Sequence, residues 1–481
     1  MNSLPFLQRR LYFAVLSGIS ALIILSFYLA FNRLERSAAS FTDAFDSSNH
    51  SHSLRPSRPN PLNPPHFSDA LRPSTPHSDP WMPLSLSACS FGMPAHYAPC
   101  AAQKLKNVEY AEELLYPDFA IREPYFAQEE HRQKWRTFTQ TADDFDRASL
   151  HLGWMQYKGQ TGQNFVFRGV RYAPTFGVDS WSPKSCMSSL VETSPIQPIT
   201  DANRPASTLP TALIALSPDS YSFQHFLDRV THILAQGHHL LDSTSAPYAL
   251  TGRGGTKTVD ELWSLMGFPE DHVLHQNFNF VAERLIFSCR AILIHPWLSL
   301  KTLDVMGVPR TSPSTTRNKV VYMSRSHGGA VNGGRRVVNE DAVLRGITTF
   351  LEERDRGEEL VMFNPDNFGN VTELFSWFSK NAMAVVGPHG GAMINHRWAN
   401  KDIFVLEFMP ANRIAMMNYE EASILSQTYA AIIVEPTTPS SFDMEIDVQD
   451  VVSLLSKHLG VEGEDPLRKS YTWRAEELGF R

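Results

Sequence analysis

The sequence lacks several features that define whole classes of protein. It has only four cysteines in 481 residues and no Cys-x-x-Cys pair, so we expect neither a disulfide-built miniprotein nor a structural zinc site. Its net charge is −7, which gives no general reason to expect nucleic-acid binding. A hydrophobic fraction of 42% is too low for a polytopic membrane protein and too high for a disordered chain. These exclusions leave a large globular protein of two or three domains.

One uncharged stretch near the start predicts where the protein sits. Residues 11–31 contain no charged side chain, and at about 1.5 Å per residue they span the roughly 30 Å hydrocarbon core of a bilayer. Arg9 and Arg10 precede the stretch, which favours a cytoplasmic tail at residues 1–10. We expect a retained anchor with the rest of the chain in a lumen or outside the cell. A cleaved signal peptide ending near Ala39 is the alternative.

The composition changes after the predicted anchor. Nine prolines fall between Pro56 and Pro83, among Ser, Asn and His residues, and no apolar periodicity remains. Such a stretch cannot bury a core, so residues 32–85 are expected to form an extended, disordered stem. The layout of anchor, stem and large body is that of a single-pass type II membrane protein.

All four cysteines follow the anchor, which fits an oxidising compartment. Two disulfides are plausible in three possible connectivities. We favour Cys89–Cys100, because the segment around it is rich in Pro and Gly and needs tethering. Asn49-His50-Ser51 and Asn370-Val371-Thr372 match the glycosylation acceptor pattern, although the second is predicted to lie in a helix.

Strand and helix patterns alternate throughout the C-terminal half. Between the predicted strands lie helical patterns, such as the one that begins after Asn339 and places Val343, Ile347 and Leu351 on one face. We expect Asn339 to cap this helix. The alternation predicts a parallel sheet covered by helices, in a Rossmann-like domain over residues 312–481. The predicted strands are Lys319–Met323, Leu360–Phe363, Ala382–Val386, Ile403–Phe408 and Ala430–Glu435.

The preceding part of the body is less regular but has a similar pattern. Thr211–Leu216 is predicted as a strand and Asp219–Gln236 as a helix. We therefore predict a second Rossmann-like domain over residues 86–311, with residues 312–318 as the linker.

Three positions at the ends of the C-terminal strands could bind a ligand, since open α/β sheets bind ligands at the carboxyl ends of their strands. The first is Ser324-Arg325, which is followed by a glycine-rich stretch ending at Arg335-Arg336 and could hold a diphosphate. A solvated surface loop is the alternative there. The third is Glu407, near the end of its strand, where a carboxylate could accept hydrogen bonds from ribose.

The second position is the loop that begins at Gly387-Pro388-His389. Gly390 and Gly391 let the backbone approach a ligand, and the N–H groups at the start of the following helix favour an anion. A tight turn with a capping histidine is the alternative. The loop matches neither Gly-x-Gly-x-x-Gly nor the Gly-Lys-Ser/Thr phosphate loop, which weighs against a dinucleotide enzyme or an ATPase.

Four blocks over about 90 residues, KVVYMSR, RRVVNED, AMAVVGPHGGAMINHRWAN and IFVLEF, together resemble the family 61 glycosyltransferases. The upstream YSFQHFLDRV (Tyr221–Val230) is similar to another block of that family. The family includes xylan xylosyl- and arabinosyltransferases of plants and O-GlcNAc transferases of the animal secretory pathway. The resemblance implies an inverting transfer from a nucleotide sugar on a GT-B fold, in which two Rossmann-like domains flank the active site.

The resemblance also assigns roles to residues. Asn339 and Glu340 would shape the donor site, and Glu407 would meet the ribose. Two departures from the family affect the assignment: His389-Gly390-Gly391-Ala392 stands where the family has His-Gly-Ala-Gly, and the long loop before Arg335 leaves open which arginine reaches the donor. The residues implied to hold the nucleotide diphosphate are Ser324, Arg325, Arg336, His389, Gly390, Gly391 and Asn395.

An inverting transfer needs a base that takes the proton of the acceptor hydroxyl. His225 and Asp228 stand at i and i+3 and so share one face of a predicted helix. We assign Asp228 as the base, or as the group that orients His225; a helix-face pair with a structural role is the alternative. A metal-dependent GT-A enzyme would need an Asp-x-Asp at a strand end, and Asp144-Phe145-Asp146 matches only in letters.

The sequence therefore predicts a glycosyltransferase that moves a sugar from a UDP-sugar to a glycan or glycoprotein, without a metal or other cofactor. Xylose and GlcNAc are the leading sugars by resemblance. We expect a Golgi membrane location, with the endoplasmic reticulum as the alternative. A carbohydrate-binding or scaffold protein on the same fold that has lost turnover is the rival from another class.

Overall fold

The computed structural model describes residues 79–141, 148–173, 196–198, 208–217, 221–241, 246–275, 280–289, 294–309, 317–326 and 334–470. The predicted anchor, the predicted stem up to residue 78, the acceptor pattern at Asn49, and Cys186 lie outside these ranges, as do Asp144-Phe145-Asp146 and most of the glycine-rich loop. The end of the predicted stem is described and corrects the prediction, because strand β1 (Leu84–Leu86) begins there and pairs with the N-terminal sheet. Within the described ranges, no helix has the length and apolar character that crossing a membrane requires.

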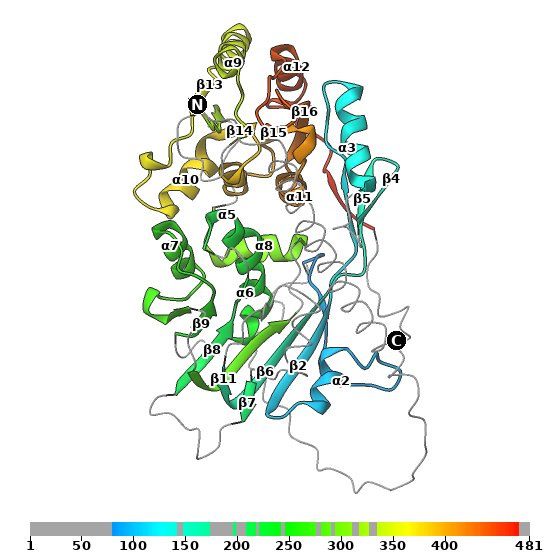
Figure 1. The fold of residues 1–481 in the computed structure, drawn as a ribbon, viewed down its shortest axis with the longest axis vertical. Helices are drawn as coiled ribbons and strands as arrows, with labels where there is room; N and C mark the ends of the chain where they lie inside the picture. Colours follow the sequence, from blue (N-terminus) through cyan, green and yellow to red (C-terminus); the bar gives the residue numbers. More distant parts are fainter. Residues whose placement is uncertain are drawn as a thin grey trace, which may run out of the picture. The chain divides into compact units, whose positions relative to one another are not determined.

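The C-terminal part contains a five-stranded sheet in which every neighbouring pair of strands is parallel (Figure 1). Its strand order, β13-β12-β14-β15-β16, is the 2-1-3-4-5 order of doubly wound folds. The direction of winding reverses between β12 and β14, so a ligand is expected at the carboxyl ends of these two strands. The strands are β12 (Lys319–Tyr322), β13 (Glu359–Met362), β14 (Ala382–Pro388), β15 (Phe404–Pro410) and β16 (Thr428–Val434).

Helices cover both faces of this sheet, as the alternating pattern predicted. α9 (Glu340–Arg354) and α12 (Val448–His458) pack on one face, where the predicted stripe of Val343, Ile347 and Leu351 is buried. α10 (Val371–Asn381) and α11 (Met417–Ile424) pack on the other. The result is a three-layer α/β arrangement, and the predicted α/β class is confirmed for this part.

The N-terminal part contains an eight-stranded sheet of mixed direction. β8 (Leu209–Ile214), β9 (Tyr248–Thr251), β10 (Val273–His275) and β11 (Phe280–Cys289) are parallel in the order β11-β8-β9-β10. The prediction of a Rossmann-like pattern therefore suits these four strands only. Antiparallel strands extend the sheet beyond β11 and correct the prediction for the part of the domain before β8: β1 (Leu84–Leu86), β2 (Val108–Leu115), β6 (Thr161–Tyr172) and β7 (Ile196–Pro198).

A third sheet joins the two ends of the body. Its order is β17-β3-β5-β4 and all of its pairs are antiparallel, so that the last described strand pairs with one of the first (red beside cyan in Figure 1). Tyr125, just after β3, forms a parallel bridge with Ala430 of β16. The strands are β3 (Phe119–Arg122), β4 (Ala148–His151), β5 (Trp154–Tyr157) and β17 (Leu467–Lys469), and α3 (Glu129–Thr141) follows β3 and contacts β16.

The shorter helices connect these sheets. They are α2 (Ala98–Ala101), η2 (Ala102–Lys104), α5 (Phe223–His225), η5 (Phe226–Val230), α6 (Thr231–Gly237), η6 (His238–Leu240), α7 (Lys257–Leu265), η7 (Glu270–His272), α8 (Pro296–Val305), η9 (Pro365–Asn367), η10 (Gly391–Trp398) and η11 (Ala411–Arg413).

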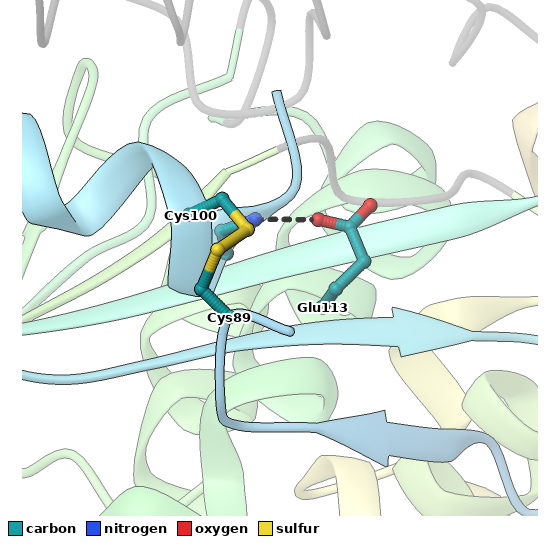
Figure 2. The surroundings of a disulfide bond; sticks show 4 residues. Cys89, Cys100 and Glu113 are labelled. Atoms are coloured by element: carbon teal, nitrogen blue, oxygen red, sulfur yellow. Dashed lines mark hydrogen bonds between the residues drawn. A yellow bond between two sulfur atoms is a disulfide. The ribbon is translucent and has the colours of Figure 1, made fainter. Parts of the chain in front are cut away.

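The predicted disulfide between Cys89 and Cys100 is present (Figure 2). It closes the loop before α2, and the N–H of Ala98 at the start of that helix donates to the buried carboxylate of Glu113, over 2.8 Å. Cys289 is also disulfide-bonded. The bridge thus tethers the Pro- and Gly-rich segment between β1 and α2, as predicted.

Asn370 occupies the N-cap position of α10, rather than a position inside the helix. It is exposed, and its side-chain oxygen accepts a hydrogen bond from the N–H of Glu373 over 2.9 Å. The second glycosylation acceptor pattern therefore begins at a helix start and not within it.

Candidate functional site

The first part of the site is the turn that follows β12. The hydroxyl of Ser324 donates to the carboxylate of Glu340, with oxygen–oxygen distances of 2.9 and 3.0 Å, and accepts from the N–H of Ser326 over 3.1 Å. Ser324 and Glu340 together hold the turn against the start of α9. The hydroxyl that we expected to contact a diphosphate is thus engaged within the protein, and Arg325 is the next side chain along the turn.

The second part is the loop that follows β14, which runs close to the first turn. A Cβ atom at position 387 would lie 2.7 Å from the carbonyl oxygen of Met323, so only glycine lets the two backbones approach. A Cβ at position 390 would lie 2.3 Å from Nη1 of Arg325. Gly390 therefore makes room for the guanidinium of Arg325, which explains why a glycine stands there in physical terms.

His389 lies between these glycines, with its ring held from one side. Its backbone N–H donates to the carbonyl of Phe408 over 2.8 Å, and its Nδ1 lies 2.7 Å from Oε1 of Glu407. A carboxylate accepts only, so this contact places a proton on Nδ1 and directs Nε2 away from Glu407. Nε2 is thereby the ring atom available to a ligand.

Glu407 is fully buried in β15 and bonds to three protein donors. Besides His389, it accepts from the amide of Asn418 over 2.6 Å and from the hydroxyl of Tyr429. Burial raises the pKa of Glu407, but His389, Tyr429 and Asn418 outweigh it and hold the pKa below its ordinary value. The predicted contact of Glu407 with ribose is therefore replaced by a different role: an ionised carboxylate that fixes the ring of His389.

Three arginines gather at the same edge of the sheet. Arg335 is 5% exposed, and its pKa falls to about 10, first because of burial and then because Arg325 and Arg413 are close. The pKa of Arg325 is also lowered, by burial and by Arg413. Neither Arg335 nor Arg413 forms an ion pair with any residue of the described ranges. Clustered cations that lower each other's pKa favour binding of an anion.

Arg336, which we expected at the donor, is occupied elsewhere. Its Nη2 lies 2.8 Å from Oδ2 of Asp443, its backbone N–H donates to Oδ1 of the same carboxylate over 2.9 Å, and its side chain is largely exposed. Arg335 adopts φ +63°, an uncommon conformation for a residue with a side chain. We therefore assign Arg335, and not Arg336, to the arginine cluster.

Asn339 and Asn395 hold the framework of the site. Asn339 stands at the N-cap position of α9, but its side chain does not cap the helix; it exchanges two hydrogen bonds with the backbone of Ile446 instead. The predicted capping by Asn339 is wrong for that reason. Asn395 donates to the carbonyl of Ala392 and accepts from Nε1 of Trp398, so its amide shapes η10 and is not free for a diphosphate.

The predicted helix around Asp228 is present but contains an unexpected turn. Between α5 and α6, residues Phe226–Val230 form a π-helical turn, η5, which is rare and is frequent at functional sites. Nδ1 of His225 lies 3.4 Å from Oδ2 of Asp228, and Arg229 lies 3.7 Å from Oδ1. The two predicted catalytic residues are thus in contact, and both side chains are partly exposed.

This helix starts directly against the loop of His389. α5 contacts η10, and a Cβ at position 391 would lie 3.3 Å from Oε1 of Gln224. The amide of Gln224 also lies 2.9 Å from the sulfur of Met417 in α11. The segment that carries His225 and Asp228 is therefore a neighbour of the loop that carries His389 and Gly390.

No group of three or more His, Cys, Asp or Glu residues able to hold a metal ion occurs in the described part of the chain. The arrangement offers instead an anion site made of arginines and a histidine, with a carboxylate and a second histidine on the adjacent helix. Such a set could bind a diphosphate and remove a proton from a hydroxyl.

The described residues form an α/β protein with a cluster of arginines at the carboxyl ends of parallel strands. Residues 223–406 match the family model Glycosyltransferase 61, less than half of the chain but including Asp228, Arg325, Arg335 and His389. In this region the chain is similar to the family 61 glycosyltransferases.

The comparisons with curated proteins and with solved structures do not indicate a function. No curated protein matches the chain. Among solved structures, two mutant forms of a flavo di-iron protein from Thermotoga maritima match with 13% identity, TM-scores of 0.22 and 0.21, and coverage of 48% of this chain. The match spans about half, 52%, of the length of those chains.

Sequence reasoning named Arg335-Arg336 together but assigned Arg336 to the site, and it missed Arg413. Arg335 and Arg336 are adjacent, and only the backbone conformation decides which one joins Arg325. Arg413 follows β15 on η11, over the ring of Phe442, and no motif distinguishes it from any surface arginine. The usable signal was positional: Arg413 comes three residues after the end of a parallel strand next to the switch point.

Proposed function

We propose that the protein transfers a sugar from a UDP-sugar to a hydroxyl group of a glycan or glycoprotein, with inversion at the anomeric carbon and without a metal ion. The observation that carries the proposal is the cluster of Arg325, Arg335 and Arg413 beside His389. A nucleotide diphosphate is negatively charged, and arginine binds phosphate oxygens bidentately.

The proposed reaction moves one proton and exchanges one bond. Asp228, in contact with His225, takes the proton of the acceptor hydroxyl, and the oxygen attacks the anomeric carbon of the donor. The bond from that carbon to the diphosphate oxygen breaks, and its electron pair leaves with UDP. Arg325, Arg335 and Arg413 stabilise the charge that develops there.

Several features support the proposed fold type, donor sugar and cellular location without testing them. A GT-B arrangement is supported by the two sheets, each with a parallel part. Xylose or GlcNAc as the donor sugar rests on the family resemblance. A type II location in the Golgi membrane is supported by the uncharged stretch at residues 11–31 and by the disulfide.

The role of Asp228 is tested by Asp228→Asn. We expect UDP binding to stay within about twofold, because the arginine cluster is intact, and UDP release from UDP-xylose or UDP-GlcNAc to fall at least about 100-fold, within the range that a general base contributes. Asp271→Asn, the same change at an exposed position of η7, serves as the control and should keep full activity. Full activity in Asp228→Asn would remove this residue as the base.

A further inference from the structure

A buried arginine connects the donor half of the site to the helix of the candidate base. Arg397, near the end of η10, is 1% exposed. Its Nη1 donates to the carbonyl oxygen of Leu227 over 3.0 Å, across 170 positions of sequence. Leu227 lies in the π-helical turn η5, directly before Asp228. The contact therefore ends one residue from the proposed base.

The carbonyl that Arg397 binds is part of an irregular turn. In η5 the hydrogen-bond ladder of the helix is widened, and the hydroxyl of Thr231 also donates to Leu227, over 2.6 Å. A wide turn of this kind leaves backbone groups that need side-chain partners. Arg397 supplies such a partner, and so it fixes the position of the turn relative to η10.

Arg397 is itself held by a buried carboxylate. Its Nη2 lies 2.9 Å from Oε1 of Glu421 in α11, although not along a straight hydrogen bond, and Ser299 of α8 donates to the other oxygen of Glu421 over 3.0 Å. Although burial raises the pKa of Glu421, Arg397 is the largest opposing influence, and the pKa lies below its ordinary value. The pair is thus ionised and joins three elements, η10, α11 and α8.

Burying Arg397 in this arrangement has an unfavourable free energy, which a purely structural contact would not require. Nε of Arg397 is buried and has no hydrogen-bond partner among the described residues, and Nη2 is poorly aligned. Apolar residues of similar volume often stabilise a core as well as or better than a buried ion pair. A buried, under-satisfied charge calls for an explanation of another kind.

We infer that Arg397 is a positioning residue for the transfer reaction: it holds the turn of Asp228 at the distance from the His389 loop that the reaction requires. The inference rests on the proposed function, because it assumes Asp228 as the base. Arg397 touches no substrate in this account and acts only through the backbone of Leu227.

The test compares two arginine-to-lysine substitutions. In Arg397→Lys the charge next to Glu421 remains, but one ammonium replaces the two separate nitrogens that meet Glu421 and Leu227. Arg317→Lys is the matched control, because Arg317 is also buried, pairs with Asp402, and has an unpartnered Nε. Arg317 lies just before β12, at the amino-terminal edge of the same sheet, whereas Ser324 and Arg325 follow the carboxyl end of that strand.

The expected result for Arg397→Lys is a loss of about tenfold or more in kcat for UDP release from UDP-xylose or UDP-GlcNAc, with the dissociation constant of UDP unchanged. Arg317→Lys should lower the melting temperature without this selective loss of kcat. Amide hydrogen exchange over residues 221–236 gives a readout without turnover: it should rise in Arg397→Lys and not in Arg317→Lys.

Two outcomes would overturn the inference. One is equal kcat in the two lysine variants; the other is unchanged exchange over residues 221–236 in Arg397→Lys. Asp228→Asn separates this failure from failure of the proposed function. If Asp228→Asn is inactive and Arg397→Lys behaves like Arg317→Lys, only the positioning role is lost, whereas full activity in Asp228→Asn removes the base itself.

Discussion

At the scale of single residues, the site depends on which of two adjacent arginines faces it. Arg335 is buried beside Arg325 and has no acidic partner in the described ranges, whereas Arg336 is largely exposed and is neutralised by Asp443. The two side chains are chemically identical, so the difference in their burial and partners comes entirely from their positions in the fold. This gives a controlled test of the anion site.

We predict that Arg335→Ala weakens UDP binding about 10- to 100-fold, because a hydrogen bond to a charged group contributes about 1.5–3 kcal/mol. Arg336→Ala should change UDP affinity less than about twofold. Isothermal titration with UDP measures both. Equal losses in the two variants, or a larger loss in Arg336→Ala, would contradict the assignment of Arg335 to the site.

A second residue-scale effect concerns the buried Glu420 of α11, which accepts from the hydroxyl of Tyr157. Burial raises its pKa from 4.5 to about 7. The folded state therefore holds this proton more tightly than the unfolded state does. The stability that this provides is fully present below about pH 4.5 and is lost as the pH rises through 7.

Glu420→Gln removes this titration but keeps an oxygen for Tyr157. We expect the variant to be more stable than the wild type at pH 8, by an amount on the order of 3 kcal/mol at most, and close to it at pH 5. Melting temperatures of both proteins at the two pH values give the comparison. A difference that does not change with pH would show that Glu420 does not titrate in this range.

At the scale of elements, α11 connects the parts of the site. It is a helix of eight residues whose first five provide contacts to four other segments. Asn418 donates to Glu407, which holds the ring of His389, and Glu421 holds Arg397. Met417 contacts the amide of Gln224, and Glu420 accepts a hydrogen bond from Tyr157. The position of α11 thus sets both the donor loop and the helix of the candidate base.

The loop after β14 makes a further element-scale prediction. Gly390→Ala places a Cβ 2.3 Å from the guanidinium of Arg325, and Gly391→Ala places one 3.3 Å from Gln224. The backbone of Gly390 is extended, so alanine is conformationally acceptable and the arginine must move.

We therefore expect Gly390→Ala to fold, with a melting temperature within a few degrees of the wild type, and to bind UDP about tenfold or more weakly. Gly391→Ala, where the amide of Gln224 needs to give by only a few tenths of an ångström, should affect UDP binding less. The idea fails if Gly390→Ala binds UDP as tightly as the wild type.

Much of this element pattern could be predicted from the sequence. The strands of the C-terminal sheet and the loops at Ser324 and His389 follow from local apolar runs and glycines, which carry their own signal. The π-helical turn at Asp228 and the left-handed backbone at Arg335 could not be predicted, because tertiary contacts determine them. The contacts of Asn339 are likewise set by a distant segment, at Ile446.

At the scale of the whole molecule, the two halves of the chain are interleaved. β17 returns from the C-terminal end to pair with β3, and Tyr125 bridges to Ala430 of β16. Such long-range antiparallel pairing leaves little local pattern in the sequence, which is why the third sheet was not predicted. The boundary predicted near residue 312 stays a prediction, but it cuts through these contacts.

We predict that a fragment of residues 312–481 does not fold cooperatively, because it lacks β3 and α3, which cover β16 and α11. Residues 75–481, which form one compact unit, should show a single sharp transition. Calorimetry of the two fragments decides the question. A cooperative transition in the shorter fragment would show that its sheet is independent of the interleaved part.

The central claim is that the arginine cluster binds a nucleotide diphosphate without a metal. The most direct measurement is the melting temperature of the full chain with UDP in the presence of EDTA, for the wild type and for Arg325→Ala. A ligand that binds the folded state raises the melting temperature by mass action. We predict a rise in the wild type that is lost in Arg325→Ala. No rise in the wild type, a rise that requires Mn²⁺, or an equal rise in both proteins would contradict the account.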